Sequence, residues 1–597
     1  MFGNLYYKDD ANVKNTIEGS WNYSIKNMLF QNENLGRDVF YTYGPLATYF
    51  FSSPALTDSF LILILPVLLS VFLALIIYFL LFKLTRFKVR SLLFLPPLFL
   101  LFHAISAIKL EFCIQFILLL IIFNVDRKKI TLNKKTILIL AFFTAFATLL
   151  KFSLGMVSVA TLSFLIFLNN KKIISKQNIK KIIFYESLVF VFLFILFYFS
   201  AKSTDIITYL SNSLQVSIGY KEYMAVDVQL PVVKFINFLL IFPILLNLFI
   251  LKKKNYPSYL ILSYFAILYG FVRNDLHVLT SLQYMFTVLV VFVYYALNKK
   301  NLTKKNKKLA FDYKLILGIF CLAFIHLHLI SNYKQNFLKP DVRLSFLKSP
   351  IWKTDQYLKK AEKNLDTGKK MIPNKIEKSI KNSSKCLMVI PNFSSVPLFV
   401  HTCQVHNVYL QYFSNYPDNS DQLNIEKIKK QYPDNLNILF HNGSIDGRIY
   451  LSESPKLLLA ILKNYKLELK ENQYLLLTPK NKRWQDIECK KSSKENHNFV
   501  QIHLKESILE KIKKTIYKPT KTYIHLQIND KTQIKRTYRS QLEYGIITDP
   551  YFQDTQDIAE FLNNPKDYNK TIKDYSLKTK DRQKEFQITE KVYYRCD

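Results

Sequence analysis

Long apolar runs in the first 330 residues constrain the fold of this chain more than any other feature. The hydrocarbon core of a bilayer is about 30 Å thick, so a spanning helix needs roughly 17–25 apolar residues. Runs that approach this length lie near 59–82, 91–106, 107–124, 136–150, 153–168, 182–200, 235–251, 257–272, 278–297 and 313–330. The pattern predicts a polytopic α-helical membrane protein with a transmembrane domain of ten helices over residues 59–330.

Basic residues between the runs predict how the helices are oriented. Loops that stay in the cytoplasm are rich in Lys and Arg. Five short loops have this composition and together contain one acidic residue, Asp126: 83–90, 125–135, 169–181, 252–255 and 298–308. They all fall on one side only if the nearly uninterrupted stretches 91–124 and 136–168 each form a helical hairpin. We therefore expect the chain in a bacterial cytoplasmic (inner) membrane, with these loops in the cytoplasm.

The opposite, extracytoplasmic side would then hold the remaining loops. It carries residues 1–58 as an N-terminal loop, the bend at Lys151, the loop 201–234, the turn within YGFVRNDLHV (269–278) and a soluble domain at 331–597. The opening residues MFGNLYYKDD lack the basic and then apolar order of an export signal. We expect that an eleventh, N-terminal helix precedes them. The alternative is that the loop is exported unaided.

The domain at 331–597 is predicted to be α+β. Short aliphatic and β-branched runs alternate in it with amphipathic stretches. The strand candidates are 386–390, 436–440, 474–478 and 522–528, and the helix candidates are 421–432, 455–464 and 505–516. No Gly-rich phosphate loop, nucleophile elbow or metal-binding motif accompanies them in the sequence. The domain therefore reads as a binding or positioning module.

The cysteines bear on the compartment of this domain. Cys386, Cys403, Cys489 and Cys596 all lie in it, and disulfides persist in oxidising compartments. Cys386 and Cys403 flank one apolar segment, which makes them the pair that we expect to form. The sequence leaves open the alternative that all four thiols are free.

The net charge of +37 does not indicate a nucleic-acid partner. Nucleic-acid-binding proteins gather Lys and Arg on one face or along one groove. Here much of the charge falls in the five loops assigned to the cytoplasm, which the membrane orientation already explains.

Ionisable residues beside the apolar runs on the extracytoplasmic side form the candidate site, because such residues are costly at membrane depth and point to function. They are Glu18, Arg37 and Asp38 in the N-terminal loop, Lys151 between two runs, Lys221 in the loop 201–234, and Arg273, Asp275 and His277 in the turn at 269–278. Ordinary explanations also exist. Lys151 could reach the outer head groups, and Arg273 could pair with Asp275 at the surface. Glu18 could begin an exposed helix.

Together these residue types suit a phosphorylated lipid substrate. Glu18 and Asp38 are the candidate catalytic carboxylates. Asp275 and His277 could hold a divalent metal, Mg²⁺ or Mn²⁺. The candidate phosphate-binding residues are the four cations Arg37, Lys151, Lys221 and Arg273.

Two phrases in these segments resemble those of known membrane proteins. DVFYTYGPLATYF (38–50) is similar to the "Y.DxPPL..Y" phrase in the first external loop of the GT-C superfamily, the membrane glycosyltransferases that use polyprenyl-phosphate-linked sugars. FYTYGPL (40–46) and FVRNDLH (271–277) also resemble a group of bacterial polytopic membrane proteins. The resemblance covers the membrane part only. The paired acid that the superfamily carries directly after its first helix is not located, because that helix is the one expected to be missing. Asp9-Asp10 and Glu18 compete for the role, and Glu18 is preferred because EGSWNYSIKN (18–27) begins a helix-like stretch that leads to the Gly-Pro-Leu phrase.

The resemblance implies a glycosyltransferase that moves a sugar from a polyprenyl-phosphate lipid to a glycan or lipid acceptor of the cell envelope. Glu18 would take the proton of the acceptor hydroxyl, and attack at the anomeric carbon would expel the lipid phosphate. Two other classes stay open. An O-antigen-type polymerase or ligase also combines many helices with a large periplasmic segment, whereas a non-enzymatic transporter or assembly scaffold would need none of these residues.

Overall fold

The computed structural model describes residues 24–25, 28, 33–50, 60–85, 110–168, 176–223, 256–271, 372–391, 396, 400, 402–410, 417–441, 454–480, 483–505, 508, 522–529, 531–578 and 588–596. The chain divides into two compact units. Unit 1 comprises Met1–Lys8, Tyr49–Ser200 and Val226–Lys360, and unit 2 comprises Asp9–Thr48, Ala201–Ala225 and Ala361–Asp597. Unit 2 therefore joins three stretches that are far apart in the sequence.

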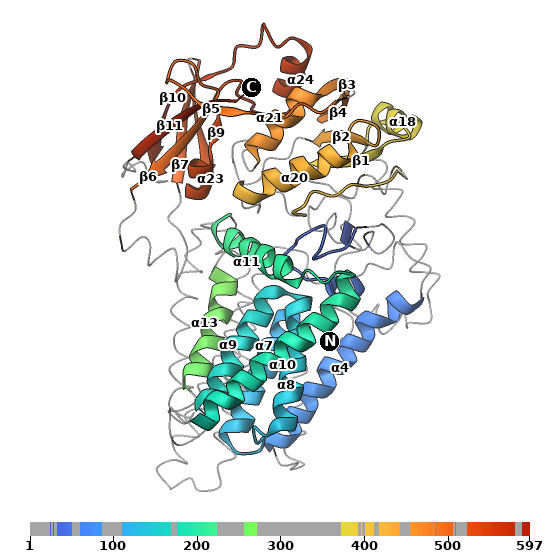
Figure 1. The fold of residues 1–597 in the computed structure, drawn as a ribbon, viewed down its shortest axis with the longest axis vertical. Coiled ribbons are helices and arrows are strands. Elements are labelled where there is room, and N and C mark those ends of the chain that lie inside the picture. The colour runs from blue at the N-terminus through green and yellow to red at the C-terminus, as the bar shows by residue number, and fades with distance from the viewer. Residues whose placement is uncertain are drawn as a thin grey trace, which may run out of the picture. The chain divides into compact units, whose positions relative to one another are not determined.

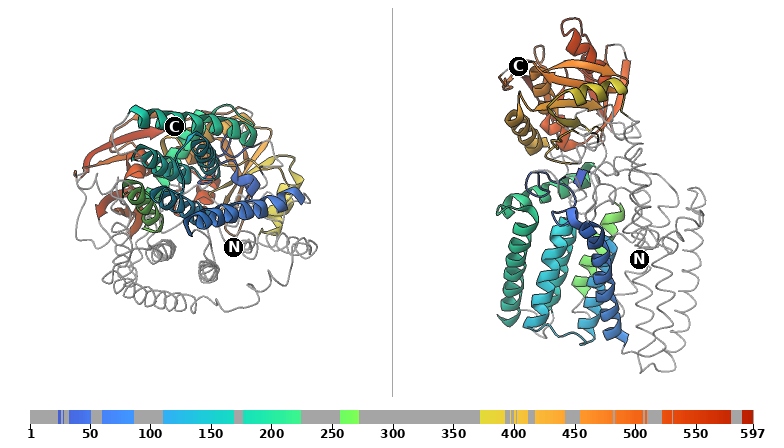
Figure 2. Two further views of the ribbon diagram at one scale, coloured as in Figure 1. Left: turned by 90° about the horizontal axis from the view of Figure 1, so that it is seen from below. Right: turned by 90° about the vertical axis from the view of Figure 1, so that its right-hand side faces the viewer.

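Unit 1 is helical in its described part. Its helices are α4 (Phe60–Thr85), α7 (Leu110–Asp126), α8 (Lys134–Leu150), α9 (Phe152–Leu168), α10 (Lys176–Ala201, which ends at the start of unit 2) and α13 (Tyr256–Phe271). They run side by side (Figures 1 and 2). Helix α9 packs against α7, α8 and α13, and α4 packs against α7. The chain passes from unit 2 to unit 1 within a short helix, α3 (Ala47–Phe50).

The hairpin of α8 and α9 shows how local sequence sets these helices. The Asn133 side chain caps α8 by accepting a hydrogen bond from the Thr136 amide at 2.9 Å. Lys151 ends α8 in an extended backbone conformation, and α9 begins at the next residue. A Cβ on Gly155 would collide with Thr148, so glycine at this position allows the two helices to approach closely.

The prediction of a ten-helix polytopic membrane protein is wrong. Among the described residues, one helix, Gln177–Ala201, is long and apolar enough to cross a membrane. The runs at 136–150 and 153–168 do form helices, but α8 and α9 have 17 residues each, or about 25 Å of helix, and more than half of their side chains are buried. The length of an apolar run does not distinguish a helix packed in protein from one packed in lipid.

Other parts of that prediction have mixed outcomes. The apolar runs near 59–82, 107–124, 182–200 and 257–272 are helices, namely α4, α7, α10 and α13. The runs near 91–106, 235–251, 278–297 and 313–330 lie outside the described residues. The segment 201–234, expected to be a loop, contains helix α11 (Ile206–Tyr223).

One half of the C-terminal part of unit 2 is built on a four-stranded sheet with the order β1-β2-β4-β3. The strands are β1 (Cys386–Ile390), β2 (Leu436–His441), β3 (Tyr465–Glu471) and β4 (Tyr474–Pro479). Strands β1 and β2 are parallel, and the other pairs are antiparallel. The accompanying helices are α18 (Asn374–Asn382), α20 (Pro417–Gln431) and α21 (Pro455–Asn464). Strand β2 is buried along its whole length, as expected for a strand covered on both faces.

The other half contains two further sheets, with the orders β5-β11-β6-β9 and β10-β7-β8. The strands are β5 (Cys489–Lys491), β6 (Phe499–Leu504), β7 (Thr522–Ile528), β8 (Lys531–Thr537), β9 (Ile546–Ile547), β10 (Ile572–Lys578) and β11 (Ile588–Cys596). Helix α23 (Arg539–Tyr544) packs on β6 of this half, whereas helix α24 (Thr555–Asn563) packs on β3 and β4 of the first half. Side chains of β6, β7 and β10 share one apolar core, and alternate residues of β7 are buried, which is the pattern of a strand with one face on a core.

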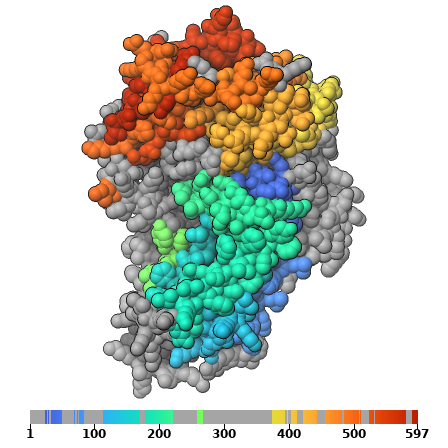
Figure 3. All heavy atoms as spheres, viewed as in Figure 1, coloured from blue at the N-terminus to red at the C-terminus, as the bar shows by residue number. Residues whose placement is uncertain are grey.

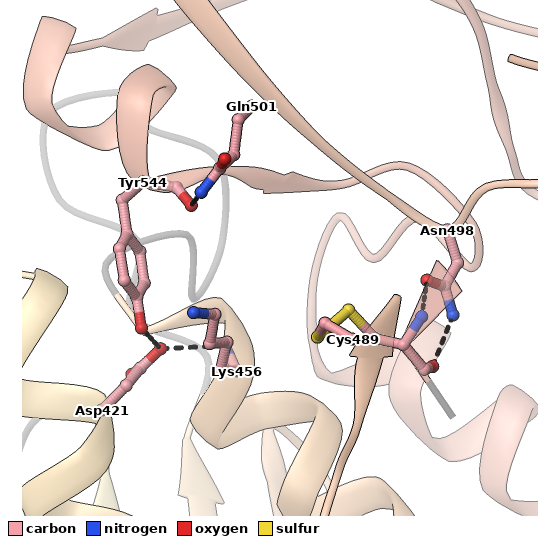
Figure 4. Close-up of a disulfide and its surroundings, with 7 residues drawn as sticks. Asp421, Lys456, Cys489, Asn498, Gln501 and Tyr544 are labelled. Atoms are coloured by element: carbon pink, nitrogen blue, oxygen red, sulfur yellow. Dashed lines mark hydrogen bonds between the residues drawn. A yellow bond between two sulfur atoms is a disulfide. The ribbon is translucent and has the colours of Figure 1, made fainter. Parts of the chain in front are cut away.

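Two disulfides fasten unit 2. Cys386 and Cys403 are bonded, which confirms the predicted pair, and their Cα atoms are 4.6 Å apart. Cys489 and Cys596, which the sequence left open, are also bonded across a separation of 107 residues. The side chain of Asn498 makes two hydrogen bonds to the backbone of Cys596 beside this second disulfide (Figure 4). Its Nδ2 donates to the Cys596 carbonyl and its Oδ1 accepts from the Cys596 amide, each at 2.8 Å.

The strand predictions for the C-terminal domain are confirmed. The candidates 386–390, 436–440, 474–478 and 522–528 correspond to β1, β2, β4 and β7. Two helix candidates correspond to α20 and α21, and the third, 505–516, lies almost wholly outside the described residues.

Candidate functional site

Three distant segments meet in unit 2, and their junction is the candidate site. They are the N-terminal residues 33–48, helix α11 and the segment 402–410. Phe40 forms a parallel bridge with Tyr409, in which the Phe40 amide donates to the Val408 carbonyl at 2.6 Å and the Leu410 amide donates to the Phe40 carbonyl at 3.0 Å. Phe40, Val408 and Tyr409 then share a small buried cluster with Val216 of α11.

A tight turn at residues 34–38 displays two of the predicted site residues. Arg37 and Asp38 form an ion pair with Nη2 and Oδ2 2.5 Å apart, and about a third of each side chain is exposed. The same Asp38 oxygen accepts a hydrogen bond from the Asn34 amide at 2.8 Å. Gly36 has φ +91°, and a Cβ there would press on Pro45 and on Tyr209 of α11. Glycine therefore allows the turn to lie against α11.

A buried charge cluster lies immediately before this turn. Oε2 of Glu33 is 2.5 Å from Nδ1 of His406 and 3.2 Å from the His406 amide nitrogen, which donates to it. Oε1 of Glu33 forms an ion pair with Lys427 of α20. The His406 side chain is fully buried, and its Nε2 has no hydrogen-bond partner. We call Glu33, His406 and Lys427 the N-terminal clamp.

Electrostatics fix the charge states in the N-terminal clamp. Burial raises the pKa of the Glu33 carboxyl, but the charge of Lys427 and the hydrogen bond from His406 outweigh that effect and lower the pKa to about 2. Burial lowers the pKa of His406, although Glu33 acts in the opposite direction. At neutral pH Glu33 is therefore a carboxylate, and His406 is a neutral imidazole whose Nδ1 donates to it. The hydrogen bonds from His406 and the ion pair with Lys427 offset the cost of burying the Glu33 carboxylate.

Helix α20 supplies a polar face to the junction. Asp421, Asn424 and Lys427 recur at intervals of three residues, which places them on one side of the helix. Oδ1 of Asn424 accepts a hydrogen bond from the Val408 amide at 2.8 Å, between the contacts that Asp421 and Lys427 make. The face thus holds the segment 402–410 at the same time as the N-terminal residues.

Asp421 sits at the N-terminal end of this face and joins three helices (Figure 4). Its Oδ2 accepts hydrogen bonds from the Tyr544 hydroxyl at 2.8 Å and from the Lys456 amide at 2.9 Å. Tyr544 ends α23, and Lys456 lies in the first turn of α21, where amide groups lack partners within the helix. Burial raises the pKa of the Asp421 carboxyl to about 7, against the lowering effect of its hydrogen bonds.

This carboxyl should make the stability of unit 2 depend on pH. In the unfolded chain Asp421 ionises near its ordinary pKa of 3.8, whereas in the folded chain it keeps its proton until about pH 7. The folded state therefore keeps this proton between these values, so Asp421 contributes a fall in the free energy of unfolding on the order of 4 kcal/mol as pH rises from about 4 to about 7. Burial lowers the pKa of His441 to about 4, which contributes a rise over much of the same range. Asp421→Asn cannot ionise and loses the falling contribution, so its free energy of unfolding should rise more with pH than that of the wild type in urea unfolding measured at several pH values.

Asp486→Asn is the matched control, because Asp486 is an exposed carboxylate of the same unit that pairs with Lys429. Exposed pairs contribute little to stability, so this variant should keep the pH dependence of the wild-type chain. A pH profile of Asp421→Asn that is indistinguishable from that of the wild type would contradict the assignment.

The structure places four of the residues predicted from the sequence. Arg37 and Asp38 lie in the turn of unit 2, and Lys221 lies in α11 of the same unit. Lys151 belongs to unit 1, at the bend between α8 and α9. The remaining candidates, Glu18, Arg273, Asp275 and His277, lie outside the described residues.

Sequence reasoning did not identify Glu33, His406, Lys427 or Asp421. None of them belongs to a motif, and Glu33 and His406 are 373 positions apart. The only local signal is a histidine within an apolar stretch, VHNVYL (405–410), which more often marks a buried histidine than a functional one.

The chemistry that this junction can perform is limited by its burial. A carboxylate that orients a neutral imidazole is the arrangement of a general base, but His406 does not reach solvent. In the part of the chain that the structure describes, no group of three or more His, Cys, Asp or Glu side chains is placed to hold a metal ion. No protein-family model, no curated protein and no solved structure matched this chain.

Proposed function

We propose that this chain is a membrane-anchored glycosyltransferase of the cell envelope, which moves a sugar from a polyprenyl-phosphate donor to a glycan or lipid acceptor on the outer face of the membrane. The observation that carries the proposal is the make-up of unit 2. This unit unites the Arg37–Asp38 turn, the helix that contains Lys221 and a domain with two disulfides. Because disulfides persist outside the reducing cytoplasm, they support an extracytoplasmic location for the turn as well.

Helix α10 supports contact with lipid. It lies on the face of unit 1 that Figure 3 shows, and many of its large apolar side chains are exposed: Ile179, Ile183, Phe184, Phe190, Val191, Phe194, Ile195, Tyr198 and Phe199. Lysines stand at its first turns and Lys202 directly follows it, as expected for a helix whose ends reach charged head groups. Exposed apolar surface of this extent marks an interaction site, and a bilayer is the partner that suits an apolar helix flanked by lysines.

The proposed reaction requires a base and a site for the leaving phosphate. A carboxylate, Glu18 in this proposal, accepts the proton of the acceptor hydroxyl while the oxygen attacks the anomeric carbon. The bond from that carbon to the phosphate oxygen breaks, and the lipid phosphate leaves with the electron pair. Arg37 in the turn of unit 2 is a partly exposed guanidinium of the kind that binds phosphate oxygens. Asp38 would orient Arg37 through their ion pair.

Sugar transfer by the purified full-length chain in liposomes tests the proposal. We expect radiolabelled sugar to pass from a polyprenyl-phosphate donor to an envelope glycan or lipid fraction. Glu18→Gln should slow the transfer by about 100-fold or more, because it removes the general base. Glu426→Gln, at an exposed site on α20, is the control and should transfer at the wild-type rate. Absence of transfer with a panel of donor sugars, or full activity in Glu18→Gln, would contradict the proposal.

A second candidate is a non-enzymatic assembly scaffold of the envelope. The observation that favours it is that the buried Glu33 carboxylate of the junction is committed to holding segments together, through its contacts with His406 and Lys427. The scaffold predicts that cells carrying Glu18→Gln together with His277→Asn keep a normal envelope, whereas the glycosyltransferase predicts the same defect as deletion of the gene.

A further inference from the structure

The turn that displays Arg37 and Asp38 is attached to the C-terminal part of unit 2 on both of its sides. Glu33, one residue before the turn, is held by His406 and Lys427. Phe40, two residues after it, is paired through its backbone with Val408 and Leu410. The turn therefore cannot shift without breaking one of these attachments.

The attachment at Glu33 is the more selective of the two. Oε2 of Glu33 accepts hydrogen bonds from Nδ1 and from the backbone amide of a single residue, His406. Oε1 of Glu33 forms the ion pair with Lys427. Removal of Glu33 or Lys427 would leave the other charge without compensation, and removal of His406 would take a hydrogen bond from the buried carboxylate; either loss costs more than that of an exposed pair. The bridge at Phe40 uses backbone groups, which any sequence could supply.

The burial of His406 decides its role. Its side chain is fully buried, so it cannot touch a substrate while the turn is in place. Its Nδ1 faces Glu33, and the segment that carries it is held by Asn424 of α20. The imidazole therefore acts through Glu33 on the position of the turn.

We propose that Glu33, His406 and Lys427 are positioning residues, through which the C-terminal domain holds the Arg37–Asp38 turn in the geometry that binds the donor phosphate. This inference rests on the proposed function for what the turn binds. It assigns to the C-terminal domain a part in the reaction, namely support of the N-terminal loop. Loss of the N-terminal clamp should then free the turn and reduce turnover, although the domain itself stays folded.

Hydrogen exchange of the full-length chain in detergent tests the attachment without an activity assay. In His406→Leu and Glu33→Gln, the peptide that covers residues 33–41 should exchange about tenfold faster or more. The first variant loses a hydrogen bond to the buried Glu33 carboxylate, and the second loses the charge that pairs with Lys427. His406→Asn should stay near the wild-type rate, because its amide nitrogen can still donate near the position of Nδ1. His503→Asn, which alters a histidine of β6, is the control. Peptides from β6 and β11 report whether the domain stays folded.

Turnover from a polyprenyl-phosphate sugar in liposomes then tests the positioning role. We expect His406→Leu to lose about tenfold or more in kcat/KM, in parallel with the freed turn, and His406→Asn to restore it. Lys427→Gln gives a second variant if His406→Leu does not fold. Unchanged exchange at 33–41 in every clamp variant, or full turnover despite a freed turn, would overturn the inference. Absence of turnover in the wild-type chain would instead overturn the proposed function, and the exchange data would still decide whether the clamp holds the turn.

Discussion

Alanine in place of Gly545 is expected to lower the free energy of unfolding of unit 2 by about 2–6 kcal/mol. Gly545 ends α23 with φ +131° and ψ 163°, a backbone conformation that is essentially confined to glycine. A Cβ would also come closer than 3.0 Å to the ring of Phe499, which is buried in the core. The free-energy costs of backbone strain and of overpacking against Phe499 therefore add. Urea unfolding of the purified chain, followed by tyrosine and tryptophan fluorescence, measures the loss.

Asn472→Gly is the control for this substitution. Asn472 lies in the turn between β3 and β4 with φ +53°, a value that glycine adopts readily. We expect its free energy of unfolding to stay within about 1 kcal/mol of the wild-type value. A Gly545→Ala variant as stable as this control would contradict the backbone geometry described for the end of α23.

Loss of the disulfide between Cys489 and Cys596 should have an effect of similar size. The bond closes a loop of 107 residues. Closure of a loop of this length lowers the conformational entropy of the unfolded chain, which stabilises the folded state by about 4–5 kcal/mol. The double variant Cys489→Ser with Cys596→Ser should therefore unfold at a clearly lower urea concentration. The hydrogen bonds of Asn498 to Cys596 should let β11 remain in place in the folded variant.

The shorter disulfide offers an internal comparison. Cys386 and Cys403 are separated by 17 residues, so the variant with both replaced by serine should lose only about 3 kcal/mol. A larger loss in this variant than in the Cys489 and Cys596 variant would show that loop length does not set the order, and that local packing of β1 does.

Strands and helices could be predicted where the local spacing of apolar residues has one physical cause, the burial of those residues. In TYIHLQI (522–528) alternate residues face a core, and the structure confirms the strand. The apolar run at 136–150 also gave a helix. The prediction that this helix spans a membrane was wrong. Apolar side chains can pack against lipid or against neighbouring helices, and the sequence does not show which of the two surrounds them. Thr144 of this helix, for example, bonds Tyr185 at 2.7 Å.

The candidate site could be predicted only in part, for a different reason. Arg37 and Asp38 stood out because charged residues beside a Gly-Pro turn are locally visible. Glu33 and His406 form a pair only through the tertiary fold, since 373 residues separate them. A glutamate in a polar loop and a histidine in an apolar segment are each unremarkable alone. Long-range pairing of this kind leaves no trace in the spacing of a single sequence.

The place of β11 in its sheet has a consequence for how unit 2 is made. This strand lies between β5 and β6, although residues 588–596 follow those strands by more than 80 residues in the chain. Until the ribosome has added residue 596, β5 and β6 lack the partner between them, and bare strand edges invite aggregation. A cell that produces this chain therefore has to shield the half-finished domain, so binding by a chaperone before β11 is complete is the step at which its yield would be decided.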